Sequence, residues 1–230
     1  MMKSKPQILR ETDLFAALAG DEIDRLAGVS DLVRLQDGDV LFLKGDLGRK
    51  VYVIAKGVVR ISIGSSDGRE AILNHVKEGQ IFGEIAAIGG GTRTADATAV
   101  GDVELLSLDH EPLIAFLMER PEACLRIMTT LCDRLRWVSD LLEDHRFLDA
   151  KARLAKRLLV LGRVFGEPVQ NGTRISLKLS QKDLAGHVGI TRERVNRFLQ
   201  DWRRDGLIDN DRGYLILCDD VKMSDIANVL

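Results

Sequence analysis

The 230-residue chain is poor in cysteine and has no long apolar run. Its three cysteines, Cys124, Cys132 and Cys218, are scattered and form neither a CxxC pair nor a metal-ligand spacing. We therefore expect buried, reduced thiols rather than a disulfide framework. The N-terminal segment MMKSKPQILRETDLF lacks the apolar stretch of a signal peptide, and no segment is long enough to span a membrane. These absences predict a cytoplasmic protein.

A strong net charge is also missing, because the formal value at pH 7 is only −2. The small total conceals an asymmetry along the chain. Residues 151–230 hold 15 Lys and Arg against 10 Asp and Glu, whereas residues 1–150 hold 18 against 25. A basic C-terminal third hints at a nucleic-acid-binding surface there, although salt-bridged surfaces give similar splits.

Proline is scarce, with four residues in the chain, and residues 122–146 contain neither proline nor glycine. Together with Pro121 at its first turn, this stretch predicts one long helix from Pro121 to Arg146. A heptad seam, typical of two helices wound around each other, consists of Leu125, Met128, Cys132, Leu135, Ser139 and Leu142. A second stripe beside it consists of Ile127, Leu131, Val138 and Leu141. We expect one stripe to face a partner chain and the other to pack on the chain's own domain.

Ser139 is the polar member of the apolar seam. Two interpretations stay open from the residues alone. The hydroxyl is either a tolerated small polar group, or it forms a hydrogen bond with something held at the seam.

Residues 33–108 have a different pattern, in which short alternating apolar runs are separated by glycine turns. The expected turns are Asp37-Gly38, Lys44-Gly45-Asp46, Lys56-Gly57, Ser66-Asp67-Gly68 and Glu78-Gly79. Many short strands with such turns predict a closed antiparallel roll or barrel, which has its own core and can hold one small ligand. Short helices are expected before it, in residues 8–29.

The segment FGEIAAIGGGTRTADATA, from Phe82 to Ala99, does not fit a strand. It predicts a single helical turn opened by a glycine, then a glycine-rich loop that ends at Arg93 and Thr94. Free N–H groups at a helix start, an arginine fork and a hydroxyl together favour a phosphate. Glu84 would be misplaced beside a phosphate but could accept hydrogen bonds from sugar hydroxyls. The alternative is an ordinary turn with an Arg93–Glu84 salt bridge.

The C-terminal third predicts two helices joined by a tight glycine turn. Asp149 is a suitable N-cap for a helix that begins at Ala150, and Ser180 with Asp183 resembles a capping box before a short helix. A second helix follows from Thr191 and stops at Gly206. The pattern fits a helix-turn-helix, and the hairpin expected over residues 207–217 makes it a winged variant. The predicted outward residues are Thr191, Arg192, Glu193, Asn196 and Arg197.

This order of elements resembles the cyclic-AMP receptor protein and FNR family of bacterial transcription regulators, and is closest to its cyclic-AMP receptors. The resemblance covers roughly residues 15–217. Two motifs carry it: the phosphate-type segment over 82–99, and QKDLAGHVGITRERVNRFLQDW with the following GLI. It implies an α+β protein with a jelly-roll-like β-roll effector domain over 1–120, a dimerisation helix over 121–147 and a winged helix-turn-helix domain over 148–230.

The resemblance also implies an effector and the residues that bind it. A cyclic nucleotide, with cyclic AMP first, would be bound by Gly83, Glu84, Ile85, Ala86, Arg93, Thr94, Val138 and Ser139. Gly83 and the adjoining backbone, Arg93 and Thr94 would meet the phosphate, and Glu84 would accept from the ribose 2′-hydroxyl. In the family's cyclic-AMP receptors, two adjacent hydroxyl residues on the dimer helix contact adenine. Ser139 matches one of them, whereas Val138 lacks the hydroxyl of the other.

For DNA, the resemblance implies a homodimer that binds a palindrome of TGTGA-like half-sites. Arg192, Glu193 and Arg197 match the family's base-reading residues, with arginine donating to guanine and glutamate accepting from cytosine. Arg194 and Asn196 depart from the family pattern and are candidates for further phosphate or base contacts. Gln181, Lys182 and Thr191 would touch backbone phosphates. RNA polymerase is a further expected partner, with no contact residues assigned.

The mechanism implied is an allosteric switch in which the DNA-binding domains pivot around residues 147–149. Other effectors stay open, namely cyclic GMP, cyclic di-GMP, or none at all. A redox or gas sensor on the same scaffold would need a fourth cysteine for an iron–sulfur cluster, or His75 as a haem ligand. A cupin-like metalloenzyme is disfavoured because the four histidines are scattered. No catalytic residue, metal or prosthetic group is therefore expected.

Overall fold

The computed structural model describes residues 3–16, 18–66 and 68–227. The chain forms two compact units, residues 1–134 and residues 135–230. The long helix α5 (Pro121–Phe147) contributes to both units. The expected turn at Ser66-Asp67-Gly68 includes Asp67, which lies outside the described residues.

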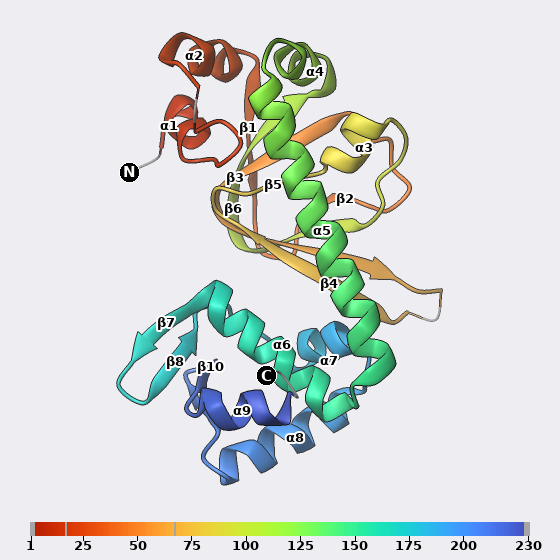
Figure 1. Ribbon diagram of the computed structural model, residues 1–230, viewed down its shortest axis with the longest axis vertical. Coiled ribbons are helices and arrows are strands. Elements are labelled where there is room, and N and C mark those ends of the chain that lie inside the picture. Colours follow the sequence, from red (N-terminus) through yellow and green to blue (C-terminus); the bar gives the residue numbers. More distant parts are fainter. Residues whose placement is uncertain (1–2, 17, 67, 228–230) are drawn as a thin grey trace. The chain divides into compact units, whose positions relative to one another are not determined.

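The first unit is built on one antiparallel sheet (Figure 1). Its strands are β1 (Ser30–Leu35), β2 (Val40–Phe42), β3 (Lys50–Gly64), β4 (Glu70–Lys77), β5 (Ile81–Phe82) and β6 (Asp96–Asp109). The order is β1-β6-β3-β4, with β2 paired to β6 and β5 paired to β3. The expected turns at Gly38, Gly45 and Gly79 form with positive φ angles of 83°, 96° and 79°. The predicted antiparallel β-roll is confirmed.

The longest strand, β3, corrects one sequence-based expectation. Lys56-Gly57 was expected to end a strand, but β3 continues through it and pairs with β6 on both sides. The register shifts between Ile54 and Val58, and Gly57 has φ 90°. A Cβ at Gly57 would lie 2.6 Å from the Asp102 carbonyl oxygen, so glycine here permits a bulge and close strand approach.

Alternation along β3 separates two apolar cores. Val51, Val53 and Ala55 pack against the helices, whereas Tyr52 and Ile54 pack inside the roll with Val59, Phe82 and Leu105. The helices are α1 (Lys5–Arg10), α2 (Gly20–Gly28), α3 (Glu84–Gly89) and α4 (His110–Glu119). The core between helices and sheet includes Ile8, Leu9, Ile23, Leu26, Leu113 and Ile127. Burial on both faces explains why β3 is continuously apolar from Val51 to Ala55.

Helix α5 confirms the predicted long helix, which ends one residue later than expected. Its predicted seam is exposed within the chain, with Leu125, Leu135 and Leu142 at 60%, 67% and 68% exposure. The second stripe packs on its own domain only in part. Ile127 is buried, whereas Val138 is 45% exposed, so the expectation that this whole stripe is covered is wrong at Val138.

The second unit contains the end of α5 and a small α/β domain. Its elements are α6 (Ala150–Phe165), β7 (Gly166–Val169), β8 (Gly172–Ile175), α7 (Gln181–Val188), α8 (Arg192–Arg204), β9 (Ile208–Asp211), β10 (Tyr214–Leu217) and α9 (Asp220–Ile226). The segment from Gly166 to Gly172 contains turn-forming residues but supplies β7, which pairs with β8 in a four-stranded sheet of order β7-β8-β10-β9.

Helices α7 and α8 form the predicted helix-turn-helix. Ser180 and Asp183 make the expected capping box of α7, and Thr191 caps α8. Gly189 ends α7 in the left-handed region at φ 68°, which suits glycine and directs the chain into α8. Val195, Leu199 and Trp202 are buried on the inward face of α8.

Among the described residues, no helix is both long and apolar enough to cross a membrane. The three cysteines are free, but Cys132 is exposed and the other two are half-buried. The expectation of buried thiols is therefore wrong for all three side chains, because the helix faces of α5 that carry Cys124 and Cys132 are not fully covered.

Candidate functional site

The phosphate-type segment follows β5 and is fixed by backbone pairing to the turn after β2. Gly83 precedes α3 in the left-handed region with φ 81°. Beyond α3, the Arg93 N–H donates to the Asp46 carbonyl at 2.8 Å, and the Gly45 N–H donates to the Arg93 carbonyl at 2.9 Å. The Arg93 end of the glycine-rich loop is thus held to the turn after β2.

Arg93 is buried beneath this loop, with only 4% of its surface exposed. Its Nη1 donates to the Gly83 carbonyl and its Nη2 to the Lys50 carbonyl, both at 2.8 Å. The guanidinium carbon lies 4.2 Å from the centre of the Phe42 ring, a cation–π contact. Burial lowers the pKa of Arg93. The arginine is therefore held under the loop by carbonyls and aromatic faces.

Glu84 is fully buried and forms an ion pair with Arg134 of α5. Arg134 also donates to the Ile81 carbonyl at 2.8 Å. The alternative interpretation of the segment, an Arg93–Glu84 salt bridge in an ordinary turn, is not what the structure contains. The sequence pattern does not single out Arg134, because nothing in the heptad pattern distinguishes it from a solvated charge.

Both charged residues retain a polar atom without a partner among the described residues. Arg93 Nε is a buried donor and Glu84 Oε2 is a buried acceptor, and neither has a hydrogen-bond partner. Unpaired buried groups are costly, typically about 1–3 kcal/mol each. A donor for an anion and an acceptor for a hydroxyl thus lie at the same loop, which suits a ligand with a phosphate and a sugar.

The remaining predicted ligand residues are distributed as follows. Ile85 is 46% exposed on α3, Ala86 is buried, and Thr94 is exposed after the loop. Val138 and Ser139 are exposed on the part of α5 that belongs to the second unit, and their role in ligand binding stays a prediction. Gly48 was missed by sequence reasoning. A Cβ there would overlap Ala86 and lie 3.3 Å from Arg93 Cδ, so α3 and Arg93 pack against bare backbone.

In the second unit, the outward side of α8 is polar and charged. Thr191, Arg192, Glu193 and Arg197 are exposed, as the sequence predicted, whereas Asn196, also predicted to point outward, is half-buried. Arg194, which was not in the predicted outward set, is exposed as well. The helix follows the glycine turn at Gly189 and presents its first residues away from the buried Val195 and Leu199. An exposed charged start on the second helix of such a motif is the arrangement that enters a DNA groove.

Comparisons with known proteins match the two parts of the chain that carry these residues. Residues 32–120 match the model of the cyclic nucleotide-binding domain, and residues 152–226 match that of the Crp-like helix-turn-helix domain. A CRP-like cAMP-activated global transcriptional regulator of Mycobacterium tuberculosis is 30% identical over 218 residues, covering 95% of this chain and 97% of the relative. The chain belongs to the CRP/FNR family of transcription regulators.

Other members of the family are also similar to this regulator. A global nitrogen regulator of Synechocystis is 34% identical and covers 73% of this chain and 76% of the relative. The solved structure of the c-di-GMP responsive global regulator CLP of Xanthomonas campestris has a TM-score of 0.75 at 26% identity. It covers 87% of this chain and 100% of the solved one. This family consists of ligand-responsive DNA-binding regulators rather than enzymes. Among the described residues, no three His, Cys, Asp or Glu side chains are grouped so as to hold a metal.

The helix-turn-helix of this CRP/FNR regulator is braced by polar contacts between its helices. Gln181 Nε2 donates to Asn196 Oδ1 at 3.1 Å, and Arg192 Nε donates to Gln181 Oε1 at 3.4 Å. Two of the predicted DNA contacts, Gln181 and Asn196, are half-buried by this network. It couples the start of α8 to the start of α7 and orients Arg192.

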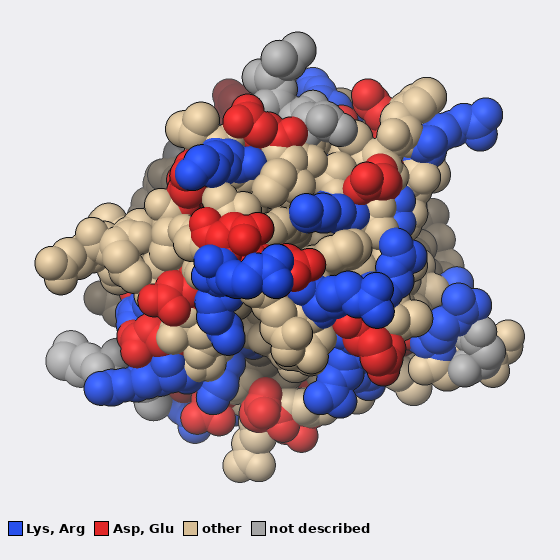
Figure 2. Space-filling view, turned by 90° about the horizontal axis from the view of Figure 1, so that it is seen from below, with Lys and Arg blue, Asp and Glu red and all other residues tan. Residues whose placement is uncertain are grey.

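The electrostatics of this face are mixed rather than uniformly basic. Figure 2, which looks from the side where α8 and α9 lie in Figure 1, shows Lys and Arg interspersed with Asp and Glu. Backbone and Thr191 hydrogen bonds, together with the Arg192 charge, lower the pKa of Glu193. Glu193 is therefore an ionised acceptor at neutral pH, as reading a cytosine amino group requires.

Proposed function

We propose that this regulator responds to a cyclic nucleotide, with cyclic AMP as the first candidate, bound at the loop that follows α3. The observation that carries the proposal is the pair of unpartnered buried atoms, Arg93 Nε and Glu84 Oε2. A cyclic nucleotide offers both partners within one small molecule. Its phosphate oxygens accept from an arginine, and its ribose 2′-hydroxyl donates to a carboxylate.

The proposed roles follow from these positions. Arg93, Thr94 and the N–H groups beside Gly83 would hold the phosphate, with Ile85 and Ala86 of α3 closing the site. Glu84 would accept from the ribose hydroxyl while it keeps its ion pair with Arg134. Because Arg134 belongs to α5, ligand binding at Glu84 would be transmitted to the long helix through this ion pair.

The proposal leaves the base of the nucleotide to be identified. The relative from Mycobacterium tuberculosis is described as cAMP-activated, and the Xanthomonas regulator as c-di-GMP responsive. In this chain, Ser139 supplies one hydroxyl for a base and Val138 supplies none. We therefore place cyclic AMP first, with cyclic GMP and cyclic di-GMP as the competing effectors.

We also propose that two chains associate through α5 and bind a palindrome of TGTGA-like half-sites. The support is the exposed apolar seam of Leu125, Met128, Leu135 and Leu142, which is costly to leave in water. Arg192, Glu193 and Arg197 would read bases, and Arg194 and Asn196 are further contact candidates. Lys182, Gln181 and Thr191 would contact phosphates.

The switch would act at residues 147–149, where α5 ends and α6 begins. The effector can shift the position of the DNA-binding domains only by binding one arrangement more tightly, with a coupling of about 1–3 kcal/mol. The liganded dimer would then present its two α8 helices at the half-site spacing. RNA polymerase would be a further partner at promoters, and a bacterial protein with these partners would act in the cytoplasm.

Isothermal titration calorimetry tests the effector. Cyclic AMP, cyclic GMP and cyclic di-GMP are titrated into the wild type and into the Arg93→Ala, Arg93→Lys and Ser139→Ala variants. We expect cyclic AMP to bind the wild type, to bind Arg93→Ala at least about 10-fold more weakly, and to bind Ser139→Ala less tightly. Lys56→Ala, which removes an exposed cation of the same domain, is the matched control and should bind like the wild type.

Two outcomes would contradict the proposal. Wild-type affinity in both Arg93 variants would exclude this loop as the site. Binding of none of the three nucleotides would exclude a cyclic nucleotide effector, and the thermal unfolding midpoint of each variant shows whether a loss reflects the site or the fold. The same titrations, repeated with a labelled TGTGA palindrome, show whether the nucleotide raises DNA affinity.

A further inference from the structure

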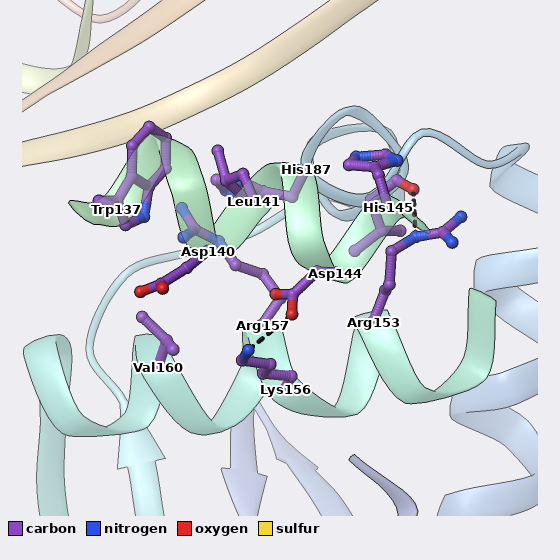
Figure 3. Close-up of a pocket in the computed structure, with 11 residues that line it drawn as sticks. Trp137, Asp140, Leu141, Asp144, His145, Arg153, Lys156, Arg157, Val160 and His187 are labelled. Carbon is purple, nitrogen blue, oxygen red and sulfur yellow. Dashed lines mark hydrogen bonds and ion pairs between the residues drawn. The ribbon is translucent and has the colours of Figure 1, made fainter. Parts of the chain in front are cut away.

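A cavity lies entirely within the C-terminal unit, between the end of α5 and helices α6 and α7 (Figure 3). Its volume is about 80 Å³. A single buried water needs roughly 10–15 Å³. The cavity can therefore hold a small polyatomic ion. It contains none of the residues assigned above to effector or DNA.

The cavity is lined by an unusual buried cation, Arg157 of α6. Only 8% of its surface is exposed, and its Nε is buried without a hydrogen-bond partner among the described residues. Figure 3 shows the side chain reaching from α6 toward α5, on the side where Trp137 and Asp140 lie. Burial lowers the pKa of Arg157 to about 10, so the group is still charged at neutral pH. An isolated buried charge is strongly unfavourable unless something pairs with it.

Most of the other charged side chains that line the cavity form ion pairs or hydrogen bonds. Lys156 Nζ pairs with Asp144 at 2.6 Å, which neutralises both. Arg153 donates to the Leu148 carbonyl at 2.8 Å and to the Val188 carbonyl at 3.3 Å, so its positive charge is hydrogen-bonded but not neutralised. Asp140 lines the cavity too, and the structure gives it no ion pair with Arg157 within the described residues. The cavity is left with more positive than negative charge.

We propose that this cavity is a binding site for a small oxyanion of the phosphate class, either free or as the phosphate of a small metabolite, held by Arg157. The arginine fork presents donors to two phosphate oxygens at once, which is the geometry that guanidinium groups favour. Arg153 adds positive charge from the same helix. The anion would neutralise the buried Arg157 and satisfy its unpaired Nε.

The location would give an anion bound there a regulatory role. Its walls come from the last turns of α5, from α6 and from α7, the first helix of the helix-turn-helix. An anion bound there would stabilise one packing of these three helices. This site is distinct from the proposed effector site at the β-roll, because no residue is shared.

Trp137 lines the cavity and serves as a local reporter. The full-length protein is titrated with inorganic phosphate at constant ionic strength in chloride, and tryptophan fluorescence and the thermal unfolding midpoint are recorded. We expect a saturable fluorescence change in the wild type and its loss in Trp137→Phe. At ten times Kd, the midpoint should rise by about 3–5 °C. Ribose 5-phosphate is a second arm, which distinguishes free phosphate from a phosphate on a metabolite.

Variants decide whether Arg157 holds the anion. Arg157→Met should lose the response and unfold at a higher temperature than the wild type, because a buried unpaired charge is removed. Arg157→Lys keeps the charge without the fork and should bind at least about 10-fold more weakly. Arg163→Met, which replaces an exposed arginine of the same helix, is the matched control and should respond like the wild type.

The Arg93→Ala variant separates this site from the effector site. It should retain the phosphate response in full, whatever it does to cyclic nucleotide binding. An equal response in Arg157→Met and the wild type would mean an adventitious ion only, and would overturn the proposal. So would a response to neither phosphate nor ribose 5-phosphate, or a response lost in Arg93→Ala.

Discussion

Arg134 of α5 pairs with the fully buried carboxylate of Glu84, the first residue of α3. The same guanidinium donates to the Ile81 carbonyl of β5 at 2.8 Å. One arginine thus connects the long helix to both ends of the segment that opens the phosphate-type loop. Because Glu84 is also the predicted ribose contact, this ion pair links the phosphate-type loop to α5.

Replacing Arg134 with Met should destabilise the protein. The substitution leaves the buried Glu84 carboxylate without its cation, a change that costs about 3–5 kcal/mol in fully buried pairs. Since the Arg134 side chain is 33% exposed, we expect the lower end of this range. Urea unfolding followed by circular dichroism measures the loss.

Two further variants identify the cause. Glu84→Gln combined with Arg134→Met should recover most of the lost stability, because the buried charge is then gone as well. Arg126→Met, which removes an exposed arginine of α5 that donates to the Asp13 carbonyl, should cost less than about 1 kcal/mol. A double variant as unstable as Arg134→Met alone would show that the ion pair is not the reason.

Gly83→Ala tests the geometry at the start of α3. A Cβ at this position would lie 2.7 Å from Arg93 Nη1, on a backbone with φ 81° that costs other residues about 1–2 kcal/mol. We expect a lower thermal midpoint and weaker nucleotide binding by calorimetry. Gly89→Ala is the matched control, because nothing lies within 4 Å of its Cβ and its φ is not positive. Equal behaviour of the two variants would show that Gly83 is not constrained.

The sequence predicted those features that local chemistry determines. The capping box at Ser180, the glycine turn between the two helices and the uninterrupted helix from Pro121 all follow from residue types at short spacing, and all are confirmed. The fold class was predictable because strand runs, glycine turns and helix signals occur in an unambiguous order. Arg93 was predictable as a loop residue, because it ends a glycine-rich stretch.

The features that were missed depend on contacts between distant segments. Arg134 meets Glu84 across 50 residues, and Gly48 matters only because α3 and Arg93 pack on it. Gly57 looked like a turn, yet pairing with β6 keeps β3 extended through it. Strand β7 contains Pro168 and the exposed residues Gly166 and Glu167, which local propensity does not favour in a strand. Only its pairing with β8 makes it a strand. Local propensity cannot indicate such partners.

A charge in the exposed seam of α5 should separate the proposed dimer. Leu135 is 67% exposed in the chain, and burying a leucine contributes about 1.5–3 kcal/mol in each copy. Leu135→Lys should therefore raise the dissociation constant at least about 100-fold. Sedimentation equilibrium measures it. Met118→Lys, at an exposed apolar residue outside the seam, should leave association unchanged. A dimer that survives Leu135→Lys would place the interface elsewhere.

Two substitutions in the helix-turn-helix should have different effects on DNA binding. Arg197 is exposed on α8 and is a predicted base contact, so Arg197→Ala should cost about 1–3 kcal/mol on a TGTGA palindrome and little on unrelated DNA. Lys182 is exposed at the start of α7 and is a predicted phosphate contact. Lys182→Ala should weaken binding to both DNAs equally and reduce the slope of log affinity against log salt by about 1.

Fluorescence anisotropy on both DNAs at several salt concentrations measures the two effects together. Because Arg197 has a role that depends on sequence and Lys182 has one that depends on charge alone, the two variants serve as controls for each other. An Arg197→Ala protein that loses affinity equally on both DNAs would show that Arg197 contacts phosphates. Reading of the half-site would then rest on Arg192 and Glu193, whose carboxylate is ionised at neutral pH because hydrogen bonds and the Arg192 charge lower its pKa.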